Sequence, residues 1–145
     1  MLRNKEGFID PTAGTAIANA MRDYRKTQKE KPRISHEIRN RPKVYVVSPY
    51  AGNTTSNTQA AIRYCSFVIE QGYIPVASHL LYTQILDDND PTSRQLGLLF
   101  GLSPLEICDE VWVFTANGIS DGMRGEIHEA RKLGKRILRI REAIQ

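Results

Sequence analysis

The pattern of apolar and polar positions is regular from residue 43 onward. Four short runs rich in β-branched and aromatic residues predict buried strands at 43–47, 73–77, 110–114 and 136–140. The segments between them have apolar positions at helical spacing, near 56–71, 80–86, 92–108 and 121–133. Strands that alternate with helices in this way predict a parallel sheet with helices on both faces.

Three residues refine this pattern. Pro75 lies in the second predicted strand and indicates an edge position, because proline cannot donate a hydrogen bond to a neighbouring strand. Pro104 predicts that the helical segment 92–108 divides after Gly101. Gly134 ends the last helix as its C′ residue. The expected fold is α/β: a flavodoxin/Rossmann-like three-layer sandwich with four to five parallel strands.

The first 42 residues have a different pattern. Apolar positions that include Ile17, Met21 and Tyr24 predict an amphipathic helix, which is able to pack on the domain or on another subunit. Residues 31–42 contain two prolines and predict a linker. A solvated, poorly ordered leader is the simpler interpretation of the whole segment, and both interpretations stay open.

Charge separates the same two regions. Residues 1–42 hold ten Lys/Arg against five Asp/Glu, whereas residues 43–145 hold ten against eleven, so the net charge of +4 arises in the first region. We therefore expect a basic helical arm with a linker over 1–42 and an α/β domain over 43–145. A nearly neutral domain argues against a nucleic-acid-binding core and allows nucleic-acid contact only through the arm, as a lesser possibility.

Composition is that of an ordinary globular protein, with 41% apolar and 25% charged residues. No apolar run approaches the roughly 20 residues that cross a bilayer, so no membrane association is expected. The segment MLRNKEGFID has no apolar h-region, which argues against a secretory signal. Cys65 and Cys108 have apolar helical surroundings and no CxxC spacing, so we expect reduced thiols and a cytoplasmic location.

Candidate site residues follow three of the predicted strands, whose carboxyl ends meet at the ligand-binding edge of such a sheet. A further candidate, Glu126, falls at about 300° from Met123 on a helical wheel, inside the apolar arc of its helix, which turns a carboxylate toward the protein. The predicted site consists of Ser48, Tyr50, Gly52, His79, Ser120, Gly122, Met123 and Glu126.

These residue types suggest chemistry, and each has a simpler explanation. Ser120 and the free N–H groups of a helix start suit an anion such as phosphate, but Ser120 also suits a plain N-cap. Tyr50 is able to stack on a base or bind a carboxylate, or merely packs in a turn. Glu126 suits nucleophilic attack on an anomeric carbon, or only complements the helix dipole.

Cofactor and metal motifs are missing from the sequence. There is no GxxxxGK[ST] or GxGxxG loop, and His36, His79 and His128 are scattered. The acidic segment 87–90 has the composition of a loop that ends a helix more than that of a cation site. We expect no cofactor and no metal.

Three segments, KVYVVSPYAG, CDEVWVF and SDGMRGEIHEA, followed by the ending GKRI, resemble the nucleoside 2-deoxyribosyltransferase-like superfamily. The resemblance covers about residues 43–141 and is closest to a small, often phage- or prophage-borne branch of unassigned function. It implies an α/β domain that binds a nucleoside or nucleotide. It also implies a homo-oligomer, because sites in this superfamily are often completed by a neighbouring subunit.

The resemblance implies roles for three residues. Glu126 resembles the glutamate that attacks C1′ and displaces the base, and Tyr50 resembles the tyrosine that orients it. Ser120 resembles the serine that serves the 5′-phosphate in 2′-deoxynucleoside 5′-phosphate N-hydrolases, which favours a nucleotide. The family usually has an Asp eight residues before the position of Asp109 to protonate the leaving base, and here that position is Gly101.

Two functional hypotheses follow. In the first, the protein cleaves an N-glycosidic bond of a nucleotide, or transfers its deoxyribosyl group, with Glu126 as nucleophile. In the second, motivated by Gly101, it is a catalytically inactive module that binds or sequesters a nucleotide. Asp88, Asp90 and His79 are the candidates to replace the missing acid, whose loss typically costs about 10²–10⁴-fold in rate.

Overall fold

The computed structural model describes residues 11–145, and this chain falls into two compact units divided between Asn40 and Arg41. The first unit is one helix, α1 (Pro11–Arg39), on which the Ile17, Met21 and Tyr24 side chains are exposed. The prediction of a linker over 31–42 is wrong for residues 31–39, which continue α1. Proline in a helix interior costs about 3 kcal/mol, which makes the helical state unfavourable there without forbidding it, and α1 continues through this segment.

The second unit contains a four-stranded sheet in which every strand is parallel to its neighbours, in the order β2-β1-β3-β4. Its strands are β1 (Lys43–Val47), β2 (Ile74–Val76), β3 (Glu110–Phe114) and β4 (Arg136–Ile140). The predicted edge position of Pro75 is confirmed, because β2 pairs only with β1. The predicted α/β fold with a parallel sheet is confirmed as well.

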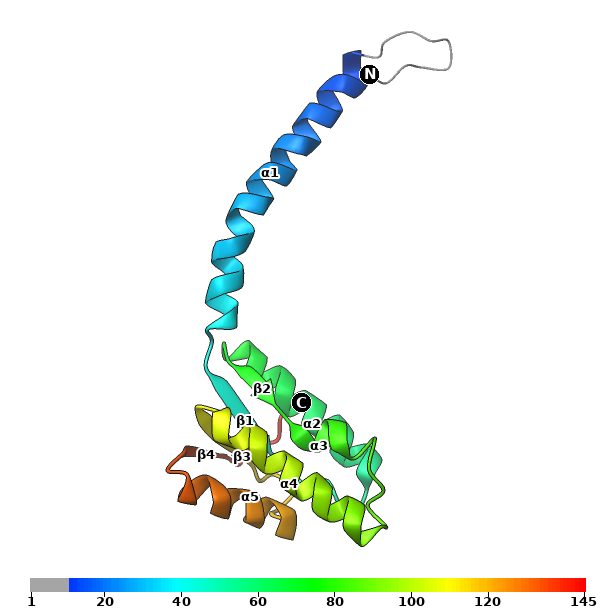
Figure 1. Ribbon diagram of the computed structural model, residues 1–145, viewed down its shortest axis with the longest axis vertical. Helices are drawn as coiled ribbons and strands as arrows, with labels where there is room; N and C mark the ends of the chain where they lie inside the picture. The colour runs from blue at the N-terminus through cyan, green and yellow to red at the C-terminus, as the bar shows by residue number, and fades with distance from the viewer. Residues whose placement is uncertain (1–10) are drawn as a thin grey trace. The chain divides into compact units, whose positions relative to one another are not determined.

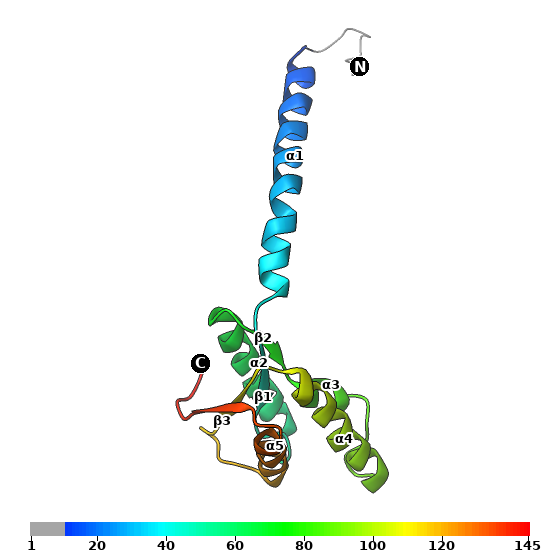
Figure 2. The same cartoon turned by 60° about the vertical axis from the view of Figure 1, so that its left-hand side comes forward.

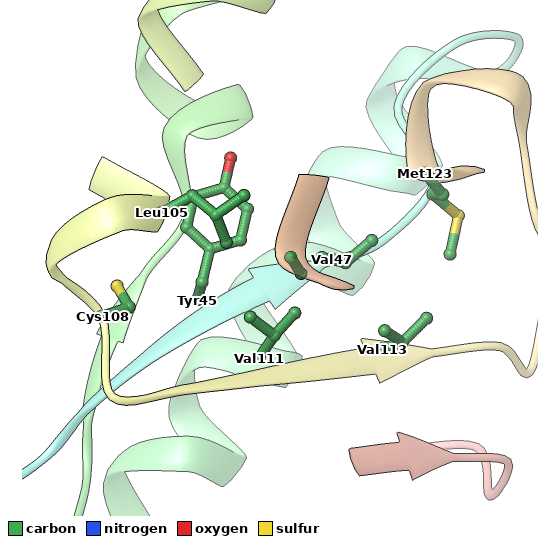
Figure 3. Close-up of a cluster of buried hydrophobic side chains, with 8 residues drawn as sticks. Tyr45, Val47, Leu105, Cys108, Val111, Val113 and Met123 are labelled. Carbon is green, nitrogen blue, oxygen red and sulfur yellow. The ribbon is translucent and has the colours of Figure 1, made fainter. Parts of the chain in front are cut away.

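Helices cover both faces of this sheet, as Figures 1 and 2 show. They are α2 (Thr54–Glu70), α3 (Ser78–Tyr82), α4 (Pro91–Ile107) and α5 (Asp121–Lys132). On one face, Val44 and Val46 pack with Tyr64, Val68 and the aromatic residues of β3. On the other face, a second buried cluster joins β1 and β3 to α4 and α5, with members that include Tyr45, Val47, Leu105, Val111 and Met123 (Figure 3). Alternate residues of each strand therefore point into opposite cores.

The predicted division of the helix at Pro104 is wrong, because α4 runs without a break from Pro91 to Ile107. Pro104 has no N–H to donate to the carbonyl of Phe100, and α4 continues past this missing hydrogen bond for three more residues. Leu105, directly after it, is fully buried and holds this end against the sheet. Lys135 Nζ donates hydrogen bonds to the carbonyl oxygens of Glu106 and Cys108, which satisfies acceptors at the helix end.

Helix starts also differ from expectation. The helix α2 begins at Thr54, two residues before the predicted start at 56, and Asn53 caps it: its side-chain oxygen accepts a hydrogen bond from Ser56 N at 3.1 Å. The helix α3 begins at Ser78, two residues before the predicted start, and residues beyond Tyr82 form turns. The predicted C′ position of Gly134 is confirmed by its φ of +67°. Among the helices of the described chain, none has the length and apolarity to cross a membrane.

Candidate functional site

A cavity of about 1020 Å³ opens at the carboxyl edge of the sheet. The loops after β1 and β2, the start of α5 and one face of α4 form its wall. This is the edge at which open parallel sheets bind ligands. The wall includes every site residue predicted from the sequence: Ser48, Tyr50, Gly52, His79, Ser120, Gly122, Met123 and Glu126. The fold therefore brings these eight residues to one cavity, and their individual roles stay predictions.

The most distinctive contact in this wall joins β1 to α5. The Tyr45 hydroxyl donates a hydrogen bond to Glu126 Oε1 at a distance of 2.9 Å. Tyr45 has no exposed surface, and Figure 3 shows its hydroxyl pointing away from β1. The Glu126 side chain is partly buried in the cavity wall. A carboxyl group is thus held in a fixed position beside a space large enough for a ligand.

Burial governs the acid–base properties of this pair. It raises the pKa of Glu126 from 4.5 to about 7, although the hydrogen bond from Tyr45 acts in the opposite direction by favouring the carboxylate. Burial, followed by the nearby Glu126 charge, raises the pKa of Tyr45 well above its ordinary value. Tyr45 therefore stays protonated and acts as a hydrogen-bond donor. Near neutral pH, Glu126 is divided between its acid and carboxylate forms.

The sequence pattern did not indicate Tyr45, and the family resemblance implied the orienting role for Tyr50. In the structure, the hydrogen bond to Glu126 comes from Tyr45, whereas Tyr50 lies in the loop after β1 with its ring edge-on to His79 at 6.3 Å. The available signal was a tyrosine in an otherwise aliphatic strand, because a buried Tyr hydroxyl usually finds a partner. Its partner lies 81 residues away, and no local pattern indicates it.

Ser48 and His79 form a second polar pair in the wall. Ser48 Oγ and His79 Nε2 are 3.0 Å apart, within hydrogen-bond distance. Burial lowers the pKa of His79 from 6.5 to about 4, so the imidazole is neutral at physiological pH. A neutral imidazole with one nitrogen paired to Ser48 offers its other nitrogen for a hydrogen bond to a ligand. It is a poor proton donor at that pH.

The start of α5 is capped by Ser120, whose Oγ accepts a hydrogen bond from Met123 N at 3.3 Å. Met123 is buried beneath the cavity, and it anchors the first turn of the helix. Asp121 forms an ion pair with Arg124 at 2.7 Å on the exposed side. The N-cap interpretation of Ser120 is therefore confirmed, and the hydroxyl also lines the cavity.

Gly101 places a helix backbone at the cavity wall where the resemblance led us to look for an acid. An ideal Cβ at this position would lie 3.3 Å from Tyr45 Oη and 3.8 Å from Ser78 Cβ. Of the suggested replacements, Asp90 caps α4 by accepting from Ser93 N at 2.8 Å, whereas Asp88 and His79 line the cavity. Ser78 Oγ is buried beside the Tyr45 hydroxyl, and its interaction with that hydroxyl opposes the effect of burial on the pKa of Tyr45.

The described residues contain no group of three or more His, Cys, Asp or Glu side chains arranged to hold a metal ion. The cavity wall does contain one arginine, Arg94, together with four acidic residues. Two of these acidic residues have basic partners on α5, through the Asp121–Arg124 and Glu129–Lys132 ion pairs.

Solved structures with a similar fold include 2-deoxyribosyltransferase from the psychrotolerant bacterium Bacillus psychrosaccharolyticus, at 15% identity over 67% of this chain and 70% of that chain, with a TM-score of 0.52. They also include 2-desoxiribosyltransferase from Leishmania mexicana, at 13% identity over 68% and 63% of the two chains, with a TM-score of 0.48. At such identities the first similarity shows a shared fold. Curated proteins give no match.

A family model also matches the α/β unit of the chain. Residues 42–140 match the model described as Domain of unknown function (DUF7768). The match spans all four strands and the helices α2 to α5, and so includes every residue of the cavity wall named above. The chain therefore belongs to the family described as Domain of unknown function (DUF7768), and its α/β domain has the fold of a 2-deoxyribosyltransferase.

Proposed function

We propose that this protein acts on the N-glycosidic bond of a nucleotide, either hydrolysing it or transferring the deoxyribosyl group to another base. The observation that carries the proposal is the Glu126 carboxyl group, which is held by Tyr45 at 2.9 Å in the wall of a cavity of about 1020 Å³. Cavities of this size suit ligands as large as a nucleotide. The fold shared with a 2-deoxyribosyltransferase supports the same chemistry.

In the proposed first step, a Glu126 carboxylate oxygen attacks C1′ of the sugar. The bond from C1′ to the base nitrogen breaks, its electron pair goes to the base, and the base takes up a proton. The product is a glycosyl ester of Glu126. Water or a nitrogen of a second base then attacks C1′, loses a proton, and restores the carboxylate.

Tyr45 takes the orienting role in this proposal. Its hydroxyl fixes Oε1 of Glu126 and stabilises the carboxylate form against the effect of burial. This interaction matters because only the carboxylate is a nucleophile. Tyr50 and His79, which contact each other edge-on, would form the wall for the base or sugar. The neutral imidazole of His79 suits hydrogen bonding to an uncharged ligand group.

The phosphate of a nucleotide would lie toward the start of α5. Ser120, Asp121 and Gly122 at the start of this helix line the cavity there, and helix N-termini favour anions. Arg94 adds a positive side chain to the same wall. The resemblance of Ser120 to the phosphate-binding serine of nucleotide N-hydrolases motivates the choice of a nucleotide over a nucleoside.

Gly101 favours a second candidate function, a nucleotide-binding module without catalysis. Position 101 has no carboxyl group and His79 is neutral, so neither residue readily donates a proton to the departing base. General acid catalysis typically contributes about 10²–10⁴-fold, so we expect slow turnover if Asp88 does not replace it. Binding without base release would identify this second function.

The test is release of free base from a panel of 2′-deoxynucleoside 5′-monophosphates and the matching nucleosides, followed by chromatography. We expect release by the wild-type protein and its loss in Glu126→Gln, which keeps the size of the side chain. Glu70→Gln, at an exposed position near the end of α2, is the matched control and is expected to retain activity. If calorimetry detects nucleotide binding but no base is released, the binding module is the correct function and the enzyme hypothesis fails. If the protein neither binds a nucleotide nor releases a base, both proposed functions are contradicted.

We also propose that the protein is a homo-oligomer. Large apolar side chains are exposed on α4, on α3 and in the turns that follow α3. They include Leu81, Ile85, Leu99 and Phe100. A helix that is apolar on all sides is normally buried, and one face of α4 already lines the cavity. A second copy of the chain covering this surface would remove it from water and lie beside the cavity wall.

A further inference from the structure

Gly101 lies inside α4, where glycine has no conformational advantage. Its φ is not positive, unlike that of the turn glycines Gly52, Gly72, Gly118 and Gly134. Glycine in a helix interior destabilises the helix relative to alanine, because its unfolded backbone has more freedom to lose. The reason for glycine at this position must therefore be the space that its missing side chain leaves.

That space is occupied by the hydroxyl group of Tyr45. A Cβ on Gly101 would lie 3.3 Å from Tyr45 Oη, which is closer than most contacts of a Cβ atom. The tyrosine ring cannot easily move, because Tyr45 is fully buried in a cluster that includes Leu105 and Val111. Its hydroxyl lies 2.9 Å from Glu126 Oε1, so any shift of the hydroxyl also changes the geometry of that hydrogen bond.

We propose that Gly101 is a positioning residue: the absence of a side chain there allows the Tyr45 hydroxyl to reach and hold the carboxyl group of Glu126. Gly101 touches neither a ligand nor Glu126 in this scheme, and it acts through Tyr45. A side chain at 101 would displace the hydroxyl by a few tenths of an ångström, which disturbs the geometry of a hydrogen bond of this length. Position 101, where the resemblance implies an acid, therefore contributes in this chain to the orientation of the proposed nucleophile, Glu126.

The contact between Gly101 and Tyr45 also affects the protonation of Glu126. The hydrogen bond from Tyr45 favours the carboxylate form of Glu126, so its loss lets burial raise the pKa of Glu126 further above about 7. The catalytic part of this consequence rests on the proposed function, because it assumes that Glu126 is the nucleophile. The titration of Glu126 itself does not depend on any activity.

The experiment measures the titration of the Glu126 carboxyl carbon by NMR in the full-length protein. In Gly101→Ala, we expect the midpoint to rise by about half a pH unit or more. Gly97→Ala is the matched control on the same helix and the same cavity wall: its Cβ would meet only Leu86 Cδ1, at 3.4 Å, the movable end of a side chain. This control is expected to leave the midpoint unchanged.

A double variant separates positioning from general disruption. In Tyr45→Phe the hydroxyl is absent, so the midpoint is already raised and adding Gly101→Ala changes it no further. An unchanged midpoint in Gly101→Ala, or an equal further rise in the Tyr45→Phe background, would overturn the proposal. If Gly101→Ala does not fold, recovery of folding in the double variant supports the steric conflict at Oη, and failure of both overturns it.

The same variants distinguish this proposal from the proposed function. If the wild-type protein releases no base while Gly101→Ala still raises the midpoint, the enzyme hypothesis fails and the positioning role stands. If base is released but the midpoint does not respond to Gly101→Ala, the enzyme hypothesis stands and the positioning role fails. If the enzyme hypothesis and the positioning role are both correct, the pH profile of base release by Gly101→Ala shifts to higher pH together with the titration midpoint of Glu126.

Discussion

Tyr45 on the first strand and Glu126 on the last helix are 81 positions apart in the chain, yet their side chains meet at 2.9 Å. The parallel sheet brings them together, because β1 pairs directly with β3, and α5 follows β3. Tyr45 then projects from the sheet face that α5 covers. The contact fixes a carboxyl group of unusual pKa in the cavity wall, and several measurable properties depend on it.

Tyr45→Phe removes the hydrogen bond while keeping the buried ring. We expect the pKa of Glu126 to rise above about 7, and base release at neutral pH to fall because less carboxylate is present. Loss of one buried hydrogen bond costs about 0.5–1.5 kcal/mol of unfolding free energy. A pH–rate profile and urea unfolding measure the two effects. Tyr64→Phe, in the core on the opposite sheet face, is the control for loss of a tyrosine hydroxyl.

The raised pKa of Glu126 predicts a specific pH dependence of stability. The pKa of the Glu126 carboxyl group is about 7 in the folded protein and 4.5 in the unfolded chain. Its contribution to stability is therefore fully present below pH 4.5 and is lost as the pH rises through 7. Glu126→Gln should remove the loss and stabilise the protein at pH 8 by up to roughly 2–3 kcal/mol. Equal wild-type and variant stability at pH 8 in urea unfolding would contradict the raised pKa.

His79 predicts the opposite slope. Its pKa is about 4 in the folded protein and 6.5 when unfolded, so its contribution is fully present above pH 6.5 and is lost as the pH falls toward 4. Between pH 4.5 and 6.5 the effects of His79 and Glu126 therefore oppose each other. We expect His79→Gln to expose the falling slope of Glu126 in this window, measured as thermal midpoint against pH. A variant curve parallel to that of the wild type would argue against a neutral buried imidazole.

Self-association should depend on the exposed apolar surface of α4. Leu99 is 56% exposed, and Leu99→Glu would place a charge in an interface that covers it. We expect the wild-type protein to sediment as an oligomer and the variant to shift toward the monomer mass of 16.4 kDa. Ile62→Glu, at a 53% exposed position on α2, is the control and should sediment like the wild type. A monomeric wild-type protein would contradict the proposed assembly.

The sequence pattern located all four strands, because each buried strand needs a short apolar run between turn-forming residues. It also identified eight residues that line the cavity, since residues at the ends of parallel strands must share one edge. The sequence pattern predicted the starts and the continuity of the helices less accurately. The cap at Asn53, the start of α3 at Ser78 and the unbroken α4 through Pro104 all differ from the expectation.

What the sequence determined by itself was the succession of strands and helices along the chain and the inward direction of Glu126, because each follows from a repeat of two or 3.6 residues. It also determined the edge position of Pro75, because proline has no backbone N–H to donate to a neighbouring strand. Only the tertiary structure decided that Tyr45 holds Glu126 and that Gly101 leaves room for this contact. These three residues lie on different elements and share no local pattern. Their relationship exists only after β1, α4 and α5 have packed against one another.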